Sequence, residues 1–201
     1  MAATIRMATV ADAREVLAIY APIVRETAIT YETEVPSEAE IAGRISSTLE
    51  AYPWLCCEID GRFAGYAYAS RFRARAAYQW TAETTVYVAD WARKRGVARG
   101  LYTSLLESCR VIGYRTAVGV IGLPNEPSVR FHRAMGFVDI GVFHRCGYKF
   151  NQWQDAGWYE RAIGDREMSP SVPPVLRTPA ACTGTAEWQA AVRSGLACVR
   201  G

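Results

Sequence analysis

The spacing of apolar residues changes several times along the first 160 residues, and each change predicts a different element. A short strand is predicted at residues 5–8. The helix predicted after it carries an apolar residue about every 3.6 positions, at Val16, Leu17, Tyr20, Ile23 and Val24. Pro22 is expected to kink or end this helix, because proline lacks an amide hydrogen. Ser37 followed by Glu40 forms a capping box, which predicts a second helix extending toward Leu49.

Strand-like runs dominate the next part of the chain. Residues 54–59 and 62–69 flank Asp60-Gly61, a dipeptide that favours a two-residue hairpin turn. Residues 81–88, with the sequence TAETTVYV, predict another strand. A basic turn containing glycine follows, and then a helix whose apolar face is formed by Val97, Leu101, Leu105 and Leu106.

A strand, a helix and further strands are predicted after that helix, which gives an α/β (α+β) chain. The strand lies at residues 117–121, and Pro127 suits the first turn of the next helix. Gly136 is expected to end that helix, and the residues up to about 159 are strand-like and aromatic-rich. Beyond residue 164 the segment SPSVPPVLRTPAACTG is rich in Pro, Ser and Thr, and residues 188–199, WQAAVRSGLACV, are compatible with a short helix to which no function is assigned. We therefore expect one domain over residues 1–163 and a poorly ordered tail over residues 164–201.

Composition and charge narrow the classes of function. The chain has 201 residues, half of them hydrophobic, and a formal net charge of +3, which is too small to argue for a nucleic-acid partner. No apolar run approaches the roughly 20 residues that a bilayer crossing needs, so no membrane partner is expected. Residues 1–16 lack the apolar stretch of a signal peptide, which predicts a cytoplasmic protein. The six cysteines include no CxxC pair, so we expect reduced thiols and no metal site.

The segment VYVADWARKRGVARG, residues 86–100, carries the most chemical information. It predicts a strand, a turn and the start of a helix, where unpaired backbone amides attract phosphate. Gly96 allows a tight turn and the close approach of an anion, while Lys94, Arg95 and Arg99 add positive charge. A solvated basic turn is the alternative interpretation. The Walker pattern GxxxxGK[ST] and the dinucleotide pattern GxGxxG are both absent.

This turn resembles the motif [QR]xxGx[GA] of the GNAT superfamily of acetyltransferases, matched at Arg93, Gly96 and Ala98. Asn125 and His132 also resemble a GNAT segment, in which an asparagine contacts CoA and a residue seven positions later faces the departing sulfur. The resemblance implies the GNAT fold, a mixed sheet splayed between its fourth and fifth strands with flanking helices, and acetyl-CoA as co-substrate. The residues that it implies for binding acetyl-CoA are Val86, Tyr87, Val88, Lys94, Arg95, Gly96, Val97, Ala98, Arg99 and Asn125.

Longer blocks are similar to the phosphinothricin and L-methionine sulfoximine (sulfone) N-acetyltransferase subfamily. The blocks are residues 52–55, 77–88, 101–108, 120–132 and 147–160, within a similarity that runs from about residue 5 to residue 160. The subfamily implies transfer of an acetyl group from acetyl-CoA to the amine of a small amino-acid-like substrate. It also implies that the amine attacks acetyl-CoA directly and forms a tetrahedral intermediate. A homodimer is implied as well.

Glu83 is the expected general base, because the subfamily has its proposed base at this position and acetylation needs an unprotonated amine. Burial would raise the pKa of this carboxyl above its ordinary value of about 4.3. An exposed glutamate in a salt bridge is the alternative. His132 is expected either to protonate the departing thiolate or to help deprotonate the amine, and the alternative is an ordinary helix residue packed beside the core.

The guanidinium groups of Arg73 and Arg75 suit a substrate carboxylate, and the subfamily resemblance implies that they bind it. Tyr31 is the implied aromatic contact, and Glu83, Thr84 and Thr85 complete the expected substrate site. Two other functions remain open. One is a non-catalytic acetyl-CoA-binding module on the same fold, and the other is a GNAT enzyme that acetylates a different amine, such as a peptide N-terminus.

Overall fold

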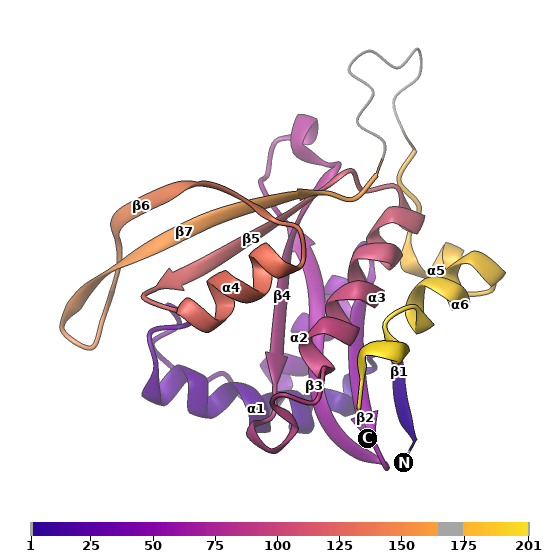
Figure 1. The fold of residues 1–201 in the computed structure, drawn as a ribbon, viewed down its shortest axis with the longest axis horizontal. Helices are drawn as coiled ribbons and strands as arrows, with labels where there is room; N and C mark the ends of the chain where they lie inside the picture. Colours follow the sequence, from indigo (N-terminus) through magenta and orange to yellow (C-terminus); the bar gives the residue numbers. More distant parts are fainter. Residues whose placement is uncertain (1, 165–174, 201) are drawn as a thin grey trace.

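A seven-stranded mixed sheet forms the centre of the computed structural model, which describes residues 2–164 and 175–200 (Figure 1). The strands lie in the order β1-β2-β3-β4-β5-β7-β6. Within the described chain β4 and β5 run parallel, and the other neighbouring pairs are antiparallel. The strands are β1 Ala3–Met7, β2 Trp54–Ile59, β3 Arg62–Arg71, β4 Thr81–Val88, β5 Thr116–Leu123, β6 Val138–Lys149 and β7 Gln152–Ala162.

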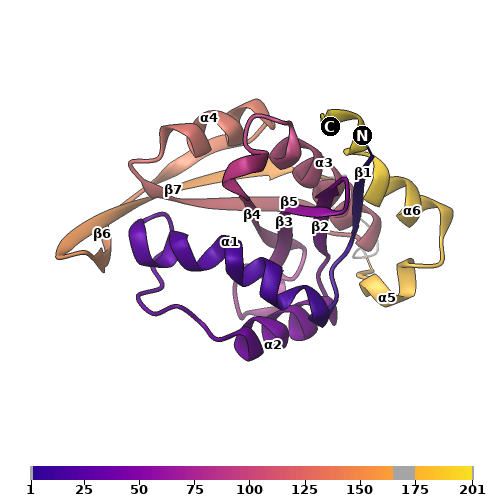
Figure 2. The same cartoon turned by 90° about the horizontal axis from the view of Figure 1, so that it is seen from below.

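Helices cover both faces of this sheet (Figure 2). One face carries α1 and α2, and the other carries α3, with α4 and α6 on either side of it. The helices are α1 Ala13–Glu26, α2 Glu38–Leu49, α3 Val97–Ile112, α4 Glu126–Ala134, α5 Pro179–Cys182 and α6 Ala186–Arg193. Short 3-10 turns are η1 Val10–Asp12, η2 Ala76–Tyr78, η3 Asp90–Ala92 and η4 Leu196–Cys198. None of the described helices has the length and apolarity needed to cross a membrane.

Local sequence signals predicted several element boundaries, and the structure confirms them. The Glu40 amide donates to Ser37 Oγ at 3.2 Å and the Ser37 amide donates to the Glu40 carboxylate at 2.6 Å, so the capping box starts α2. Asp60 and Gly61 both have positive φ, 51° and 76°, as the tight turn between β2 and β3 requires. Gly136, with a φ of 82°, follows the end of α4.

Pro22 does not end α1, because the helix continues to Glu26. Residue 22 and Ala18, whose carbonyl would accept the missing hydrogen bond, both lie on the exposed side of the helix. Water can therefore satisfy that carbonyl. Tyr20 and Val24 are buried on the opposite side and hold the last turn against the core.

The parallel pair of β4 and β5 is short. It joins Thr81, Ala82 and Glu83 to residues 116–118 of β5, and the two strands then diverge. Beyond Glu83, β4 stays paired with β3 as far as Val88, while β5 stays paired with β7 as far as Leu123. The predicted splay between the fourth and fifth strands is confirmed, and it leaves one edge of β4 without a strand partner.

The last part of the chain differs from the poorly ordered tail that we expected over residues 164–201. Residues 175–200 contain α5, α6 and η4, which pack beside α3. Trp188, Ala191 and Val192 are buried on one side of α6, so apolar residues at helical spacing outweigh the Pro- and Ser-rich composition of the tail. Residues 165–174 and 201 lie outside the described residues.

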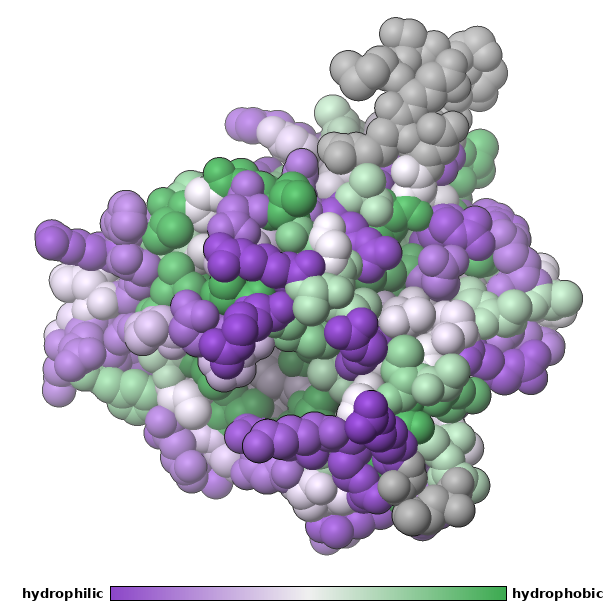
Figure 3. Space-filling model, viewed as in Figure 1, coloured by the Kyte–Doolittle hydropathy of each residue, from purple (hydrophilic) through white to green (hydrophobic). Residues whose placement is uncertain are grey.

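The hairpin of β6 and β7 extends away from the helices and exposes apolar side chains (Figures 1 and 3). Trp153 is 63 % exposed and Phe143 is 54 % exposed. We call this region the β6–β7 apolar surface, and its residues are Val138, Ile140, Val142, Phe143, Tyr148, Phe150 and Trp153. Apolar surfaces of this kind mark sites of interaction with another molecule.

Candidate active site

A cavity of about 280 Å³ opens where β4 and β5 diverge. Its walls come from these two strands and their neighbours β3 and β7, from α1, α3 and α4, and from the loop after α1. Figure 3 shows the surface hollowed between α1 and α4. The cavity brings together eight of the predicted site residues, which are Tyr31, Glu83, Thr84, Thr85, Val86, Tyr87, Asn125 and His132.

Glu83 lies at the fork between the two strands, because it belongs to the last residue pair of β4 and β5. Its side chain lines the cavity, and burial raises the pKa of the Glu83 carboxyl. The structure shows no lysine or arginine of the described chain in an ion pair with it. Glu83 is therefore not the salt-bridged surface residue that was its alternative interpretation, and its position suits a group that accepts a proton.

His132 lies on α4 with its side chain buried. Its Nδ1 is 2.9 Å from the Ser128 carbonyl oxygen, which can only accept, so Nδ1 carries the hydrogen. In the neutral ring Nε2 is then an acceptor, and it lies 3.0 Å from the Tyr102 hydroxyl. Burial lowers the pKa of His132 below its usual 6.5, which favours the neutral ring.

Tyr102 is a site residue that the sequence analysis did not identify. It belongs to the buried face of α3, yet it lines the cavity. Its hydroxyl has one hydrogen to donate and lies 3.0 Å from both the Thr84 carbonyl oxygen and Nε2 of His132. Burial raises the pKa of Tyr102, so the hydroxyl keeps its proton. A tyrosine on an apolar helix face needs a polar partner for its hydroxyl, and this was the signal available in the sequence.

Asn125 precedes α4 and caps it, because its side-chain oxygen accepts a hydrogen bond from the Ser128 amide at 3.3 Å. The same residue lines the cavity opposite β4. The cap fixes the start of α4, and about two turns later this helix presents His132. A capping role and a contact with acetyl-CoA are compatible, because the cap uses only the side-chain oxygen.

The turn before α3 has the geometry of an anion site. Gly96 is the N-cap residue with a φ of 79°, and no described side chain caps the helix at this end. A cleft of about 240 Å³ beside the turn reaches Phe131 on α4. The predicted cofactor contacts that line this cleft are Val88, Lys94, Gly96, Val97, Ala98 and Arg99. Arg95 does not line it, and its guanidinium carbon lies 5.8 Å from the ring centre of Trp91.

Arg73 and Arg75 are exposed, and neither lines the cavity. The Arg73 guanidinium carbon lies 5.1 Å from the ring centre of Phe72 and 6.0 Å from that of Trp158. The structure thus brings Tyr31, Thr84 and Thr85 to the cavity but leaves both arginines outside it. In the described part of the chain, His, Cys, Asp and Glu form no group of three or more that could hold a metal ion.

Comparisons with known proteins match this architecture. The family model described as "Acetyltransferase (GNAT) domain" matches residues 5–158. The phosphinothricin N-acetyltransferase of Streptomyces viridochromogenes is 40% identical over 157 residues, which are 78% of this chain and 86% of that protein. The L-methionine sulfoximine/L-methionine sulfone acetyltransferase of Pseudomonas paraeruginosa is 33% identical over 172 residues, which are 85% of this chain and 100% of that protein.

A solved structure shows the same fold. It is a GNAT superfamily phosphinothricin acetyltransferase from Sinorhizobium meliloti in complex with AcCoA, with a TM-score of 0.81 and 34% identity. The match covers 90% of this chain and 98% of that one. These matches and the splayed sheet show that the chain belongs to the GNAT family of acetyl-CoA-dependent N-acetyltransferases.

Proposed function

We propose that this enzyme acetylates the amine of a small amino-acid-like substrate of the phosphinothricin, L-methionine sulfoximine or L-methionine sulfone type. The observation that carries the proposal is the place of Glu83, a cavity-lining carboxylate with a raised pKa at the fork of β4 and β5. The names of the relatives from Streptomyces viridochromogenes and Pseudomonas paraeruginosa support the substrate class.

Acetyl-CoA fits the cavity beside residues 83–87 of β4 together with the cleft beside Val88 and Gly96. Its diphosphate would meet the first-turn amides of α3 and the positive charge of Lys94 and Arg99 in the cleft beside Gly96. Its acetyl end would reach the cavity along the unpaired edge of β4, with Asn125 on the opposite wall. The residues of the site therefore suit this co-substrate.

Glu83 accepts the proton of the substrate ammonium, directly or through water. The freed lone pair of the amine forms a bond to the thioester carbon, and the carbonyl oxygen becomes an oxyanion. Backbone N–H groups of Val86 and Val88 would donate to this oxyanion, because this edge of β4 has no strand partner beyond Glu83. The C–S bond then breaks, and the CoA thiolate leaves.

Tyr102 and His132 handle the remaining proton transfers of the reaction. After attack the nitrogen has a second proton to lose, and the departing thiolate needs one. The Tyr102 hydroxyl holds a proton, while Nε2 of His132 has a free lone pair 3.0 Å away. We infer that Nε2 of His132 accepts the second proton and that Tyr102 donates one to the sulfur, so that a proton passes along their contact.

The loop between β3 and β4, which carries Arg73 and Arg75, borders the β6–β7 apolar surface. Trp158 lies beside Arg73, and its ring centre is 5.2 Å from that of Phe143, a member of the β6–β7 apolar surface. A second copy of the chain on this surface would bury it and would enclose Arg73 and Arg75 at the interface. We therefore propose a homodimer, in which these arginines bind the substrate carboxylate beside the cavity.

Replacing Glu83 by Gln removes the base but keeps the size of the side chain. CoA release from acetyl-CoA with L-methionine sulfone, L-methionine sulfoximine or phosphinothricin should fall roughly 10²- to 10⁴-fold in kcat. Because burial raises the pKa of Glu83, the wild-type rate should fall as the pH drops through that raised pKa, and E83Q should lack this dependence.

Glu50→Gln, at the exposed end of α2, is the matched control and should turn over like wild type. A wild-type rate in E83Q would refute the role of Glu83. If the wild-type enzyme released CoA only with a peptide N-terminus, the substrate class would be wrong.

Gly119 leaves room for the imidazole of His132. A Cβ at this position would lie 2.8 Å from His132 Cδ2 and 2.9 Å from Nε2, so Gly119→Ala should displace the ring from Tyr102 and lower kcat on the order of 10²-fold. Gly43→Ala on α2 is the control, because a Cβ there meets nothing within 4 Å. Equal turnover of the two variants would show that the His132–Tyr102 contact does not serve the reaction.

Multi-angle light scattering should give about twice the chain mass of 22.2 kDa. Trp153→Glu on the β6–β7 apolar surface should give a monomer with a raised KM for the amine, because Arg73 and Arg75 lose their enclosure. Val10→Glu replaces another exposed apolar residue, 54 % exposed and outside that surface, and should remain dimeric. A wild-type mass of one chain would rule out the homodimer.

A further inference from the structure

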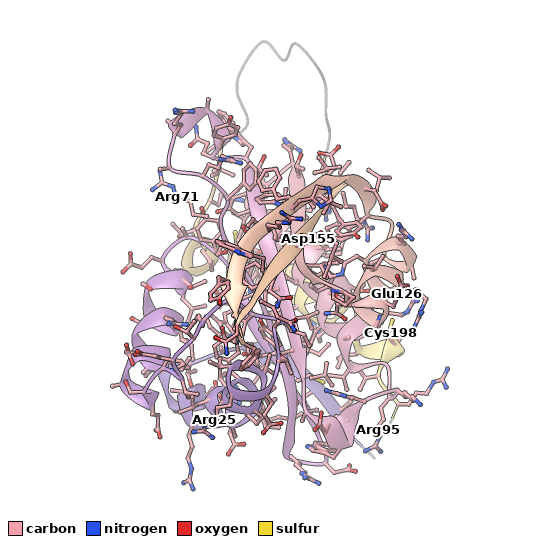
Figure 4. All side chains as sticks on the ribbon, turned by 90° about the vertical axis from the view of Figure 1, so that its left-hand side faces the viewer. Arg25, Arg71, Arg95, Glu126, Asp155 and Cys198 are labelled. Atoms are coloured by element: carbon pink, nitrogen blue, oxygen red, sulfur yellow. The ribbon has the colours of Figure 1, made fainter. Side chains whose placement is uncertain are left out.

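The end of the chain lies against the start of α3. The Arg200 amide donates a hydrogen bond to the Arg95 carbonyl oxygen at 2.8 Å, and the Gly195 amide donates to Ser104 Oγ at 3.1 Å. Figure 4 labels Arg95 and Cys198, which lie on the same side of the molecule. Residues 195–200 therefore connect the turn before α3 with the middle of the same helix. We call them the C-terminal strap.

Two glycines let the strap approach this closely. A Cβ at Gly96 would lie 1.8 Å from the Cys198 carbonyl oxygen, and a Cβ at Gly100 would lie 2.7 Å from Val199 Cγ2. Glycine is thus required at position 96 for two reasons: a side chain would clash with the strap, and the φ of 79° favours glycine. Lys94 has a positive φ of 61° as well, so the turn holds two residues in an uncommon backbone conformation.

The strap does not cover the diphosphate cleft. That cleft is lined by residues of β4, η3, α3 and α4, and none of residues 175–200 belongs to its lining. Buried Trp188 and Val192 of α6 fix the segment that precedes the strap. The strap therefore contacts the turn from one side and leaves the side toward Phe131 open.

Peptide geometry links these two sides. The Arg95 carbonyl and the Gly96 N–H belong to one trans peptide group, whose C=O and N–H point in opposite directions. A hydrogen bond that holds the Arg95 oxygen toward the strap consequently directs the Gly96 N–H away from it. The strap lies beyond residues 5–158, the part of the chain that the family model matches.

We propose that the C-terminal strap is a positioning element for acetyl-CoA, in which the Arg200 amide holds the Arg95–Gly96 peptide so that its N–H faces the diphosphate. This inference rests on the proposed use of the cleft beside Gly96. Arg200 acts through its backbone and is a positioning residue, not a catalytic one.

Arg200→Pro tests the proposal, because proline lacks the donating N–H and places its ring Cδ where that hydrogen pointed. Val199 has extended angles, φ −85° and ψ 127°, which a following proline accepts. The Kd and KM for acetyl-CoA should rise roughly 2- to 12-fold, as the loss of one hydrogen bond predicts, with kcat and the KM for the amine unchanged. Arg200→Ala keeps the amide and gives the reference value.

Equal acetyl-CoA affinity in the proline and alanine variants would overturn the proposal. So would an equal rise in both, because the guanidinium group and not the amide would then be responsible. If Arg200→Pro unfolds, a chain ending at Ser194 replaces it, and an unchanged KM for acetyl-CoA in that chain would also refute the strap. Calorimetry on the wild-type chain distinguishes a failure of the strap proposal from a failure of the proposed function. An absence of acetyl-CoA binding to the wild-type chain would refute the proposed function itself.

Discussion

The early divergence of β4 and β5 is the constraint on which the site depends. A parallel pair normally continues its ladder of evenly spaced hydrogen bonds, but here the ladder stops at the pair of Glu83 and Val118. Each strand keeps its other partner, β3 or β7, so the fork stays rigid while one edge of β4 is open. Open backbone groups need partners, and an extended co-substrate with amide and thioester groups can supply them.

The fork also explains the electrostatics of the cavity. Glu83 and His132 face the same space, and burial shifts their pKa values in opposite directions, upward for the carboxyl and downward for the imidazole. Both shifts favour the uncharged forms. The Glu83 carboxylate thereby becomes a stronger base, and His132 stays a neutral ring that can accept a proton. Tyr102 connects this chemistry to α3, because its hydroxyl contacts both Thr84 on β4 and His132 on α4.

Local and family signals predicted much of this arrangement. The sequence predicted three local features, the capping box of Ser37, the Asp60-Gly61 turn and the Gly96 turn. Each of them depends on only a few neighbouring residues. Tertiary packing explains two features: the order of the tail, which its composition mispredicted, and the place of Tyr102, which the sequence analysis did not identify. The helix α6 is ordered because Trp188 and its neighbours are buried where the helix packs beside α3. Tyr102 contacts His132 because α3 and α4 pack together in three dimensions, which no local sequence pattern reveals. Arg73 and Arg75 were assigned from guanidinium chemistry and from the subfamily resemblance, and a single chain leaves them outside the cavity.

The most direct test of the account is a titration of ¹⁵N-labelled protein with acetyl-CoA, followed by the backbone amide resonances. We expect the largest shifts along the open edge of β4, at residues 84–88, and in the turn and first helical residues at 96–99. The β3-paired amides of β2 and the exposed hairpin of β6 and β7 should change little. Saturating acetyl-CoA that left residues 84–88 and 96–99 unperturbed would contradict the claim that the fork of β4 and β5 forms the acetyl-CoA site.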